Sequence, residues 1–139
     1  MAAENFDPFA QELRGPELTA DLLGKLFILQ WSKRHGKSRL PEKGALNRLF
    51  LDSYENAPTQ VRQLLHADYR LQDPEIVEIT DFLVAGQRVG LVERPNPSHV
   101  PCDTRLTPYW AGWFLDSYQD DFREELGWLD GVISKLKPS

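Results

Sequence analysis

Two extended segments joined by a proline-rich loop constrain the fold of this chain most. Residues 90–94 (Gly-Leu-Val-Glu-Arg) have the composition of a short strand, and the loop 95–101 contains three prolines. Because proline fixes φ and favours an extended conformation at the residue before it, the loop cannot be helical. A second extended segment, 103–108, ends in Thr107-Pro108. Threonine is a good N-cap and proline suits the first helical position, so a new helix is expected to begin there.

The amino-acid sequence of residues 90–108 resembles that of winged-helix regulators of the MarR and PadR type. Those chains commonly read Gly-Leu-Val-Glu-Arg, a charged wing, an arginine and Leu-Thr, followed by a dimerisation helix. The resemblance covers residues 45–110, with a shorter wing here and with Tyr109-Trp110 where the family often has glycine. It implies a mainly α fold with a small β-hairpin: a winged helix-turn-helix plus long N- and C-terminal helices that pair in a dimer. In that fold the hairpin is the wing, and the preceding helix enters the major groove of DNA.

Length and apolar content predict one domain. The chain has 139 residues, of which 41% are hydrophobic, enough for a substantial core. Residues 1–16 have few apolar anchors and are expected to be a flexible arm. Residues 17–139 are expected to form a single winged-helix domain. Within it, 45–107 is the expected winged-helix core, and 17–35 and 108–137 are the expected dimerisation helices.

Apolar residues at helical spacing predict the helices of the core. A broad apolar face over 17–35 stops at His35-Gly36, a second helix is expected over 45–54, and a short third helix follows Pro58. Asp73-Pro74 predicts the start of a fourth helix, as N-cap and first helical residue.

The expected last helix, 108–137, is longer than most helices of globular domains. A long amphipathic helix needs a partner to cover its apolar stripe, so we expect a homodimer. The expected dimer-interface residues are Trp110, Trp113, Phe114, Phe122, Leu129 and Ile133. The tryptophans could instead line a ligand pocket, although aromatic residues at helical spacing more often form a core or an interface.

Charge is unevenly distributed along the chain. The net charge is −5, but residues 25–48 hold seven basic residues and one acidic residue. The whole chain is therefore not a nonspecific polyanion binder, while this one segment could form an electrostatic footprint for DNA.

Basic side chains near the expected helix-turn-helix and wing are the candidate DNA contacts. Lysine and arginine neutralise phosphates and release counterions whatever the base sequence. The candidates are Lys33, Arg34, Lys37, Arg39, Arg62, Arg70, Arg94 and Arg105. The resemblance implies that Arg105 is a wing arginine and that Asp103 braces it. The alternatives are a solvated connector for residues 33–39 and an exposed cross-strand ion pair in the wing.

Acidic residues on the expected fourth helix favour a second hypothesis. Glu75, Glu78 and Asp81 would be repelled by phosphates if they lay on a DNA-reading helix. The chain could then be a winged-helix-derived protein–protein interaction module that does not read DNA and binds a basic protein.

No motif in the sequence indicates catalysis or a cofactor. There is no Gly-rich phosphate loop, nucleophile elbow or metalloprotease motif, so we do not expect an enzyme. His99 and Cys102 alone are a poor metal site, because structural zinc usually needs four ligands. With one cysteine, no signal-peptide pattern and no apolar run of about 18 residues, a cytoplasmic protein is expected.

Overall fold

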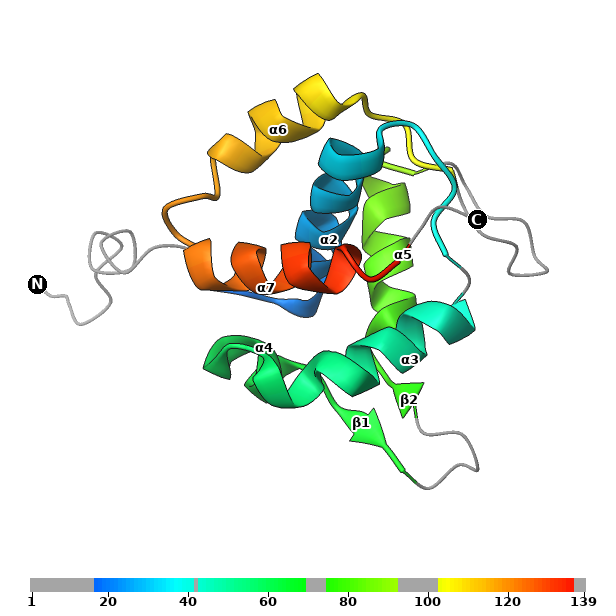
Figure 1. Ribbon diagram of the computed structural model, residues 1–139, viewed down its shortest axis with the longest axis vertical. Helices are drawn as coiled ribbons and strands as arrows, with labels where there is room; N and C mark the ends of the chain where they lie inside the picture. Colours follow the sequence, from blue (N-terminus) through cyan, green and yellow to red (C-terminus); the bar gives the residue numbers. More distant parts are fainter. Residues whose placement is uncertain (1–16, 42, 70–74, 93–102, 137–139) are drawn as a thin grey trace, which may run out of the picture.

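The protein is mainly helical, in agreement with the sequence-based expectation, and has one small antiparallel sheet (Figure 1). This sheet pairs residues 67–68 with 75–76, whereas the hairpin expected at 90–94 and 103–108 shows one bridge, Val92 with Thr104, among the described residues. The computed structural model describes residues 17–41, 43–69, 75–92 and 103–136. Its elements are α2 (Ala20–His35), α3 (Lys43–Ser53), the 3-10 turn η1 (Tyr54–Asn56), α4 (Thr59–Leu64), β1 (Ala67–Asp68), β2 (Glu75–Ile76), α5 (Ile79–Arg88), α6 (Pro108–Asp116) and α7 (Arg123–Ile133). The expected arm 1–16 lies outside the described residues.

Helix α2 is the centre of the molecule, and α5, α6 and α7 all pack against it (Figure 1). Its start is fixed by Thr19, whose Oγ1 accepts a hydrogen bond from the Leu22 amide at 3.1 Å. Its end is fixed by Gly36, whose φ of 68° suits glycine, as the sequence predicted. Between these caps the helix is buried on several sides, which explains why its apolar face is so broad in the sequence.

Helices α2 and α5 pack closely where they cross, and two glycines permit this close approach. A Cβ on Gly24 would overlap the backbone and side chain of Phe82, and a Cβ on Gly86 would overlap the side chain of Ile28. Because each glycine lacks a Cβ, the facing helix can lie closer than it could beside any other residue.

Phe50 of α3 joins the helices into one core. Its ring makes edge-to-face contacts with Phe27 of α2 at 5.5 Å, and with Phe82 of α5 and Trp128 of α7 at 5.6 Å each. Such pairs add to the hydrophobic stabilisation that comes from burying the rings.

The expectation of one helix over 108–137 is wrong. The segment forms α6 and α7, with a turn at 117–122 between them, and both helices pack on α2. Folding back lets α7 bury Phe122, Leu129 and Ile133 in the core of the same chain. The α7 part of the apolar stripe for which we expected a second chain is thus covered by α2 and α3 of the same chain, whereas Trp110, Trp113 and Phe114 of α6 are exposed.

The expected helix start at Asp73-Pro74 is also wrong in part. Residues 73–74 lie outside the described residues, but Glu75 and Ile76 form β2, and the helix begins only at Ile79. The strand pairs Ile76 with Ala67 and Glu75 with Asp68, and the Asn47 side chain accepts a hydrogen bond from the Ile76 amide. Partners from other segments therefore override the local helix signal.

No helix among the described residues is long and apolar enough to span a lipid bilayer.

Candidate nucleic-acid interface

Three short extended segments meet beside the C-terminal ends of α2 and α5. Residues Arg39 and Asp103 form one antiparallel bridge, and Val92 and Thr104 form another. The Thr104 amide donates to the Ser38 carbonyl at 2.8 Å, and the Arg105 amide donates to the Leu91 carbonyl at 3.0 Å. Residues 103–105 thus lie between 38–39 and 91–92.

A buried hydroxyl holds these segments together. Thr104 is only 4% exposed; its Oγ1 donates to the Gly36 carbonyl at 2.9 Å and accepts from the Ser38 amide at 3.0 Å. The indole Nε1 of Trp31 donates to Ser38 Oγ at 2.9 Å. The connection after α2, which carries the basic residues, is therefore fixed by hydrogen bonds to the core helix and to the segment before α6.

The lysines and arginines of the last turn of α2 and of the connection after it fall into two groups, those with an ion pair and those without. Arg34 forms an ion pair with Asp130 of α7 at 3.3 Å, and Arg39 forms one with Asp103 at 3.1 Å. Lys33 and Lys37 are exposed and make no ion pair with another described residue. Since exposed ion pairs contribute only about 0–1 kcal/mol, the two arginines can exchange a carboxylate for another anion at small cost.

Asp103 has a different partner from the one that the resemblance implied. It accepts from Arg39, which lies 64 positions earlier, while Arg105 is exposed and makes no ion pair with a described residue. The expectation that Asp103 braces Arg105 is therefore wrong. The chain separation explains the error, because nothing local in the sequence links residue 39 to residue 103.

Helix α5 presents fewer acidic residues than the sequence suggested. Glu75 lies in β2, and Glu78 binds His66: its Oε1 accepts from the His66 amide at 2.7 Å, and its Oε2 lies 2.9 Å from Nδ1. Only Asp81 lies within the helix, in its first turn, where the helix dipole favours a negative charge. Arg88, which was not among the candidates, is exposed in the last turn of α5.

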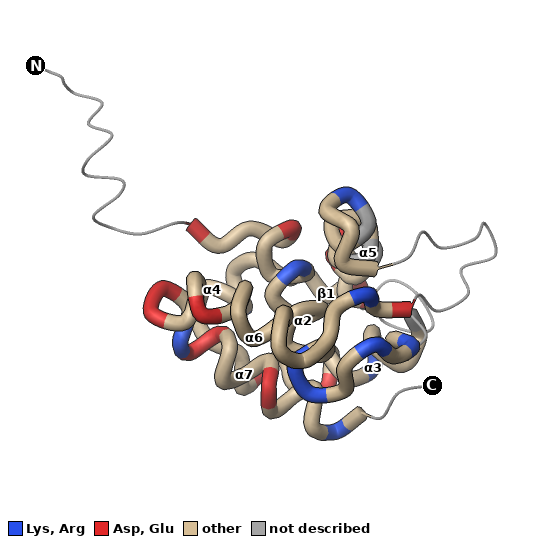
Figure 2. Tube along the Cα trace, turned by 90° about the horizontal axis from the view of Figure 1, so that it is seen from above, with Lys and Arg blue, Asp and Glu red and all other residues tan. Residues whose placement is uncertain are grey.

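The remaining candidate DNA contacts do not lie among the described residues near the paired segments 38–39, 91–92 and 103–105. Arg62 is exposed on α4, and its carbonyl accepts a hydrogen bond from the Tyr54 hydroxyl at 2.9 Å. Arg70 and Arg94 lie outside the described residues, as do His99 and Cys102. Figure 2 shows the basic positions of α3 on one side of the molecule and the acidic turn after α6 on the other.

The expected dimer-interface residues fall into two groups. Phe122, Leu129 and Ile133 are buried inside the chain, so they are not available to a second copy. Trp110, Trp113 and Phe114 are exposed on α6. The sequence pattern could not separate the groups, because both have helical spacing.

An aromatic ligand pocket and a metal site both have little support in the part of the chain that the structure describes. An open surface depression between α2 and α7 is lined by Gln30, Lys33, Arg34 and Asp130, and none of these residues is aromatic. No three His, Cys, Asp or Glu side chains among the described residues come together as a metal site.

No family model, no curated protein and no solved structure matches this chain.

Proposed function

We propose that this chain is a DNA-binding transcriptional regulator of the winged-helix kind, acting as a homodimer. One observation carries the proposal: the pairing of residues 38–39, 103–105 and 91–92, which places the basic connection after α2 beside Arg105 and the end of α5. After α5, Val92 and Thr104 form an isolated antiparallel bridge before α6 begins. A helix followed by two paired extended segments is the order expected for a recognition helix and a wing.

The charges suit contacts to the DNA backbone. Lys33, Lys37 and Arg105 are exposed, and Arg34 and Arg39 are held only by exposed ion pairs. Backbone contacts of this kind supply affinity and set the register without reading bases. Base reading would fall to the exposed face of α5, where arginine at position 88 can donate to guanine.

The test is a binding assay with genomic DNA fragments at two salt concentrations. We expect retention of particular fragments and a steep salt dependence. Changing Lys33, Lys37 and Arg105 to Ala together should weaken binding to every sequence and lower the salt slope by about one for each phosphate that the variant leaves unneutralised. An unchanged salt slope would exclude this surface.

Arg105→Ala alone separates binding from folding. Its side chain is exposed, so the variant should keep the unfolding free energy within about 0.5 kcal/mol. If the arginine contacts a phosphate or a base edge, DNA affinity should fall by about 1–3 kcal/mol. Arg123→Ala, which removes an exposed arginine at the start of α7, is the matched control and should bind DNA normally.

A second candidate is a protein–protein interaction module without DNA binding. The observation that favours it is a group of exposed valines, Val77, Val84 and Val89, in and beside α5, where a DNA-reading helix would carry polar side chains. No retention of any fragment at low salt would favour this function over the first.

A further inference from the structure

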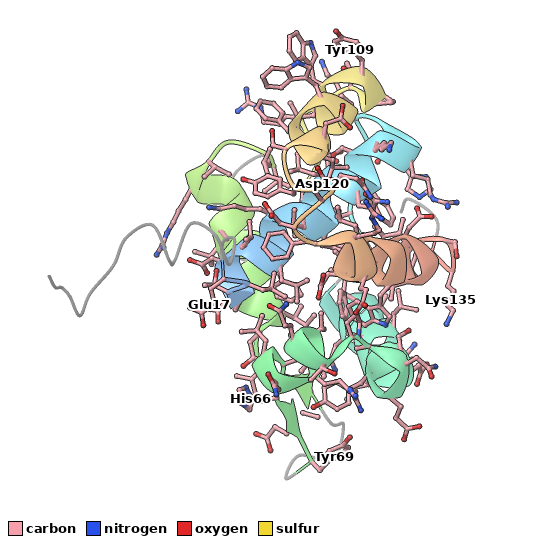
Figure 3. The ribbon with its side chains drawn as sticks, turned by 90° about the vertical axis from the view of Figure 1, so that its left-hand side faces the viewer. Glu17, His66, Tyr69, Tyr109, Asp120 and Lys135 are labelled. Carbon is pink, nitrogen blue, oxygen red and sulfur yellow. The ribbon has the colours of Figure 1, made fainter. Side chains whose placement is uncertain are left out.

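Helix α6 exposes four neighbouring aromatic side chains to solvent. They are Tyr109 (71% exposed), Trp110 (49%), Trp113 (55%) and Phe114 (41%). Ring centroids lie 5.3 Å apart for Tyr109–Trp110, 5.9 Å for Trp110–Trp113 and 5.1 Å for Trp113–Phe114, all edge-to-face. Figure 3 shows this cluster around Tyr109 projecting from one end of the molecule. We call these four residues the aromatic face.

The aromatic face is a surface of α6 and not part of the core. Ala111 and Leu115, on the opposite side of the helix, are buried, and Gly112 lies close to the Lys33 side chain of α2. The helix is therefore held by its small and aliphatic residues. Contiguous exposed patches of large apolar side chains commonly mark a place where another molecule binds.

The two ends of α6 carry opposite charge. At its N-terminal end, Pro108 packs near Gly36, so the exposed Lys37 lies close by, and the exposed Arg105 precedes the helix by three residues. At its C-terminal end, the exposed carboxylates are Asp116, Asp120 and Asp121. Lys37, Arg105, Asp116 and Asp121 make no ion pair with another described residue.

We propose that a second copy of this chain docks on the aromatic face, with the two α6 helices antiparallel across a twofold axis. In a twofold interface each contact between two positions occurs twice, with the copies exchanged. An antiparallel arrangement sets the acidic end of each α6 beside the basic end of the other, whereas a parallel arrangement would bring like charges together. The opposite helix dipoles favour the same arrangement.

The area of the aromatic face sets the strength of this contact. The full surface of one aromatic side chain is about 150–250 Å². Multiplied by the four exposed fractions, this gives roughly 300–500 Å² of exposed aromatic surface on each copy. Stable dimers usually bury about 800 Å² on each partner. The contact is therefore weak unless the charged ends add to it, and the dimer should dissociate on dilution and weaken as salt rises.

This contact deepens the proposed function by naming its dimer surface, but it is measured without DNA. The experiment is sedimentation of the full chain over a range of micromolar concentrations. The unmodified chain should change from monomer to dimer as concentration rises. Trp110→Ala with Trp113→Ala should raise the dimer dissociation constant at least about tenfold, about 1.4 kcal/mol. The melting temperature should not fall at concentrations at which both chains are monomeric.

Tyr69→Ala is the matched control for the loss of an exposed aromatic side chain. Tyr69 is 70% exposed just after β1, and Figure 3 shows it at the end of the molecule opposite Tyr109. This variant should dimerise like the unmodified chain. A chain that stays monomeric at every concentration, or a dimer that the tryptophan variant leaves unchanged, would overturn the proposal.

The orientation is tested with two charge variants. Asp116→Lys with Asp121→Lys makes both ends of α6 basic, and Lys37→Glu with Arg105→Glu makes both ends acidic. Each variant alone should dimerise more weakly, and an equimolar mixture should form a heterodimer at least as strong as the unmodified dimer. Variants that each dimerise as strongly as the unmodified chain, or a mixture that pairs no better than the separate variants, would exclude the antiparallel arrangement. Because no DNA is present, failure of DNA binding and failure of this contact are distinguishable.

Discussion

Single side chains fix the junction between α2, the basic connection and α6. The ring of His35, the last residue of α2, lies against Trp31 at a tilt of 50° with centroids 4.4 Å apart, and its Nε2 is buried without a partner among the described residues. Burial, and then the neighbouring Arg34 charge, lower the pKa of His35 from 6.5. The neutral ring is therefore the form that this junction accommodates.

The lowered pKa predicts a loss of stability in mild acid. The unfolded chain binds a proton at His35 near pH 6.5, whereas the folded chain binds it only at lower pH, so stability falls as pH drops through that window. Chemical unfolding at several pH values from neutral to mildly acidic should show this fall. His35→Phe keeps the ring on Trp31 without a titrating group and should flatten the dependence; an equally steep fall in that variant would contradict the prediction.

The Thr104 hydroxyl is the second residue-scale determinant. Thr104→Val keeps the shape but leaves the Gly36 carbonyl and the Ser38 amide without their side-chain partner. The expected loss in unfolding free energy is about 1–3 kcal/mol. Thr59→Val, at an exposed position in α4, is the matched control and should change it by less than about 0.5 kcal/mol. Equal effects in denaturant titrations of both variants would contradict this role.

At the scale of elements, the same substitution should have opposite effects in two helices. Gly24→Ala forces a methyl group into Phe82 at the α2–α5 crossing, so it should destabilise the protein by about 1–3 kcal/mol. Gly127→Ala, on the exposed side of α7 with nothing near its Cβ position, should stabilise it by about 0.5–1 kcal/mol. Melting temperatures of the two variants would show the difference, and a shift in the same direction for both would be inconsistent with the close crossing.

At the scale of the whole molecule, one core joins all the large helices. The buried cluster runs without interruption from α2 through α3 and α5 to α7, with Phe50 at its centre. We therefore expect one cooperative unfolding transition. Tryptophan fluorescence and far-ultraviolet circular dichroism should give the same denaturant midpoint. An earlier fluorescence transition that is absent in the Trp110→Ala and Trp113→Ala variant would instead mean that α6 detaches first.

The sequence by itself determined the elements whose signals are local. Gly36 ends α2, Pro58 precedes α4, and Thr107-Pro108 start α6, because caps and prolines act within one turn of the chain. The helix-rich character of the fold follows from the same signals together with apolar spacing.

Only the tertiary structure decided where distant segments meet. The division of 108–137 into α6 and α7 depends on the core that α2 and α3 offer to Phe122 and Leu129, and a helical pattern does not reveal whether its apolar side faces its own chain or another. The strand at Glu75 depends on Ala67–Asp68, and the Arg39–Asp103 pair joins residues 64 positions apart. Such contacts form because folding brings their partners together, and no local propensity encodes them.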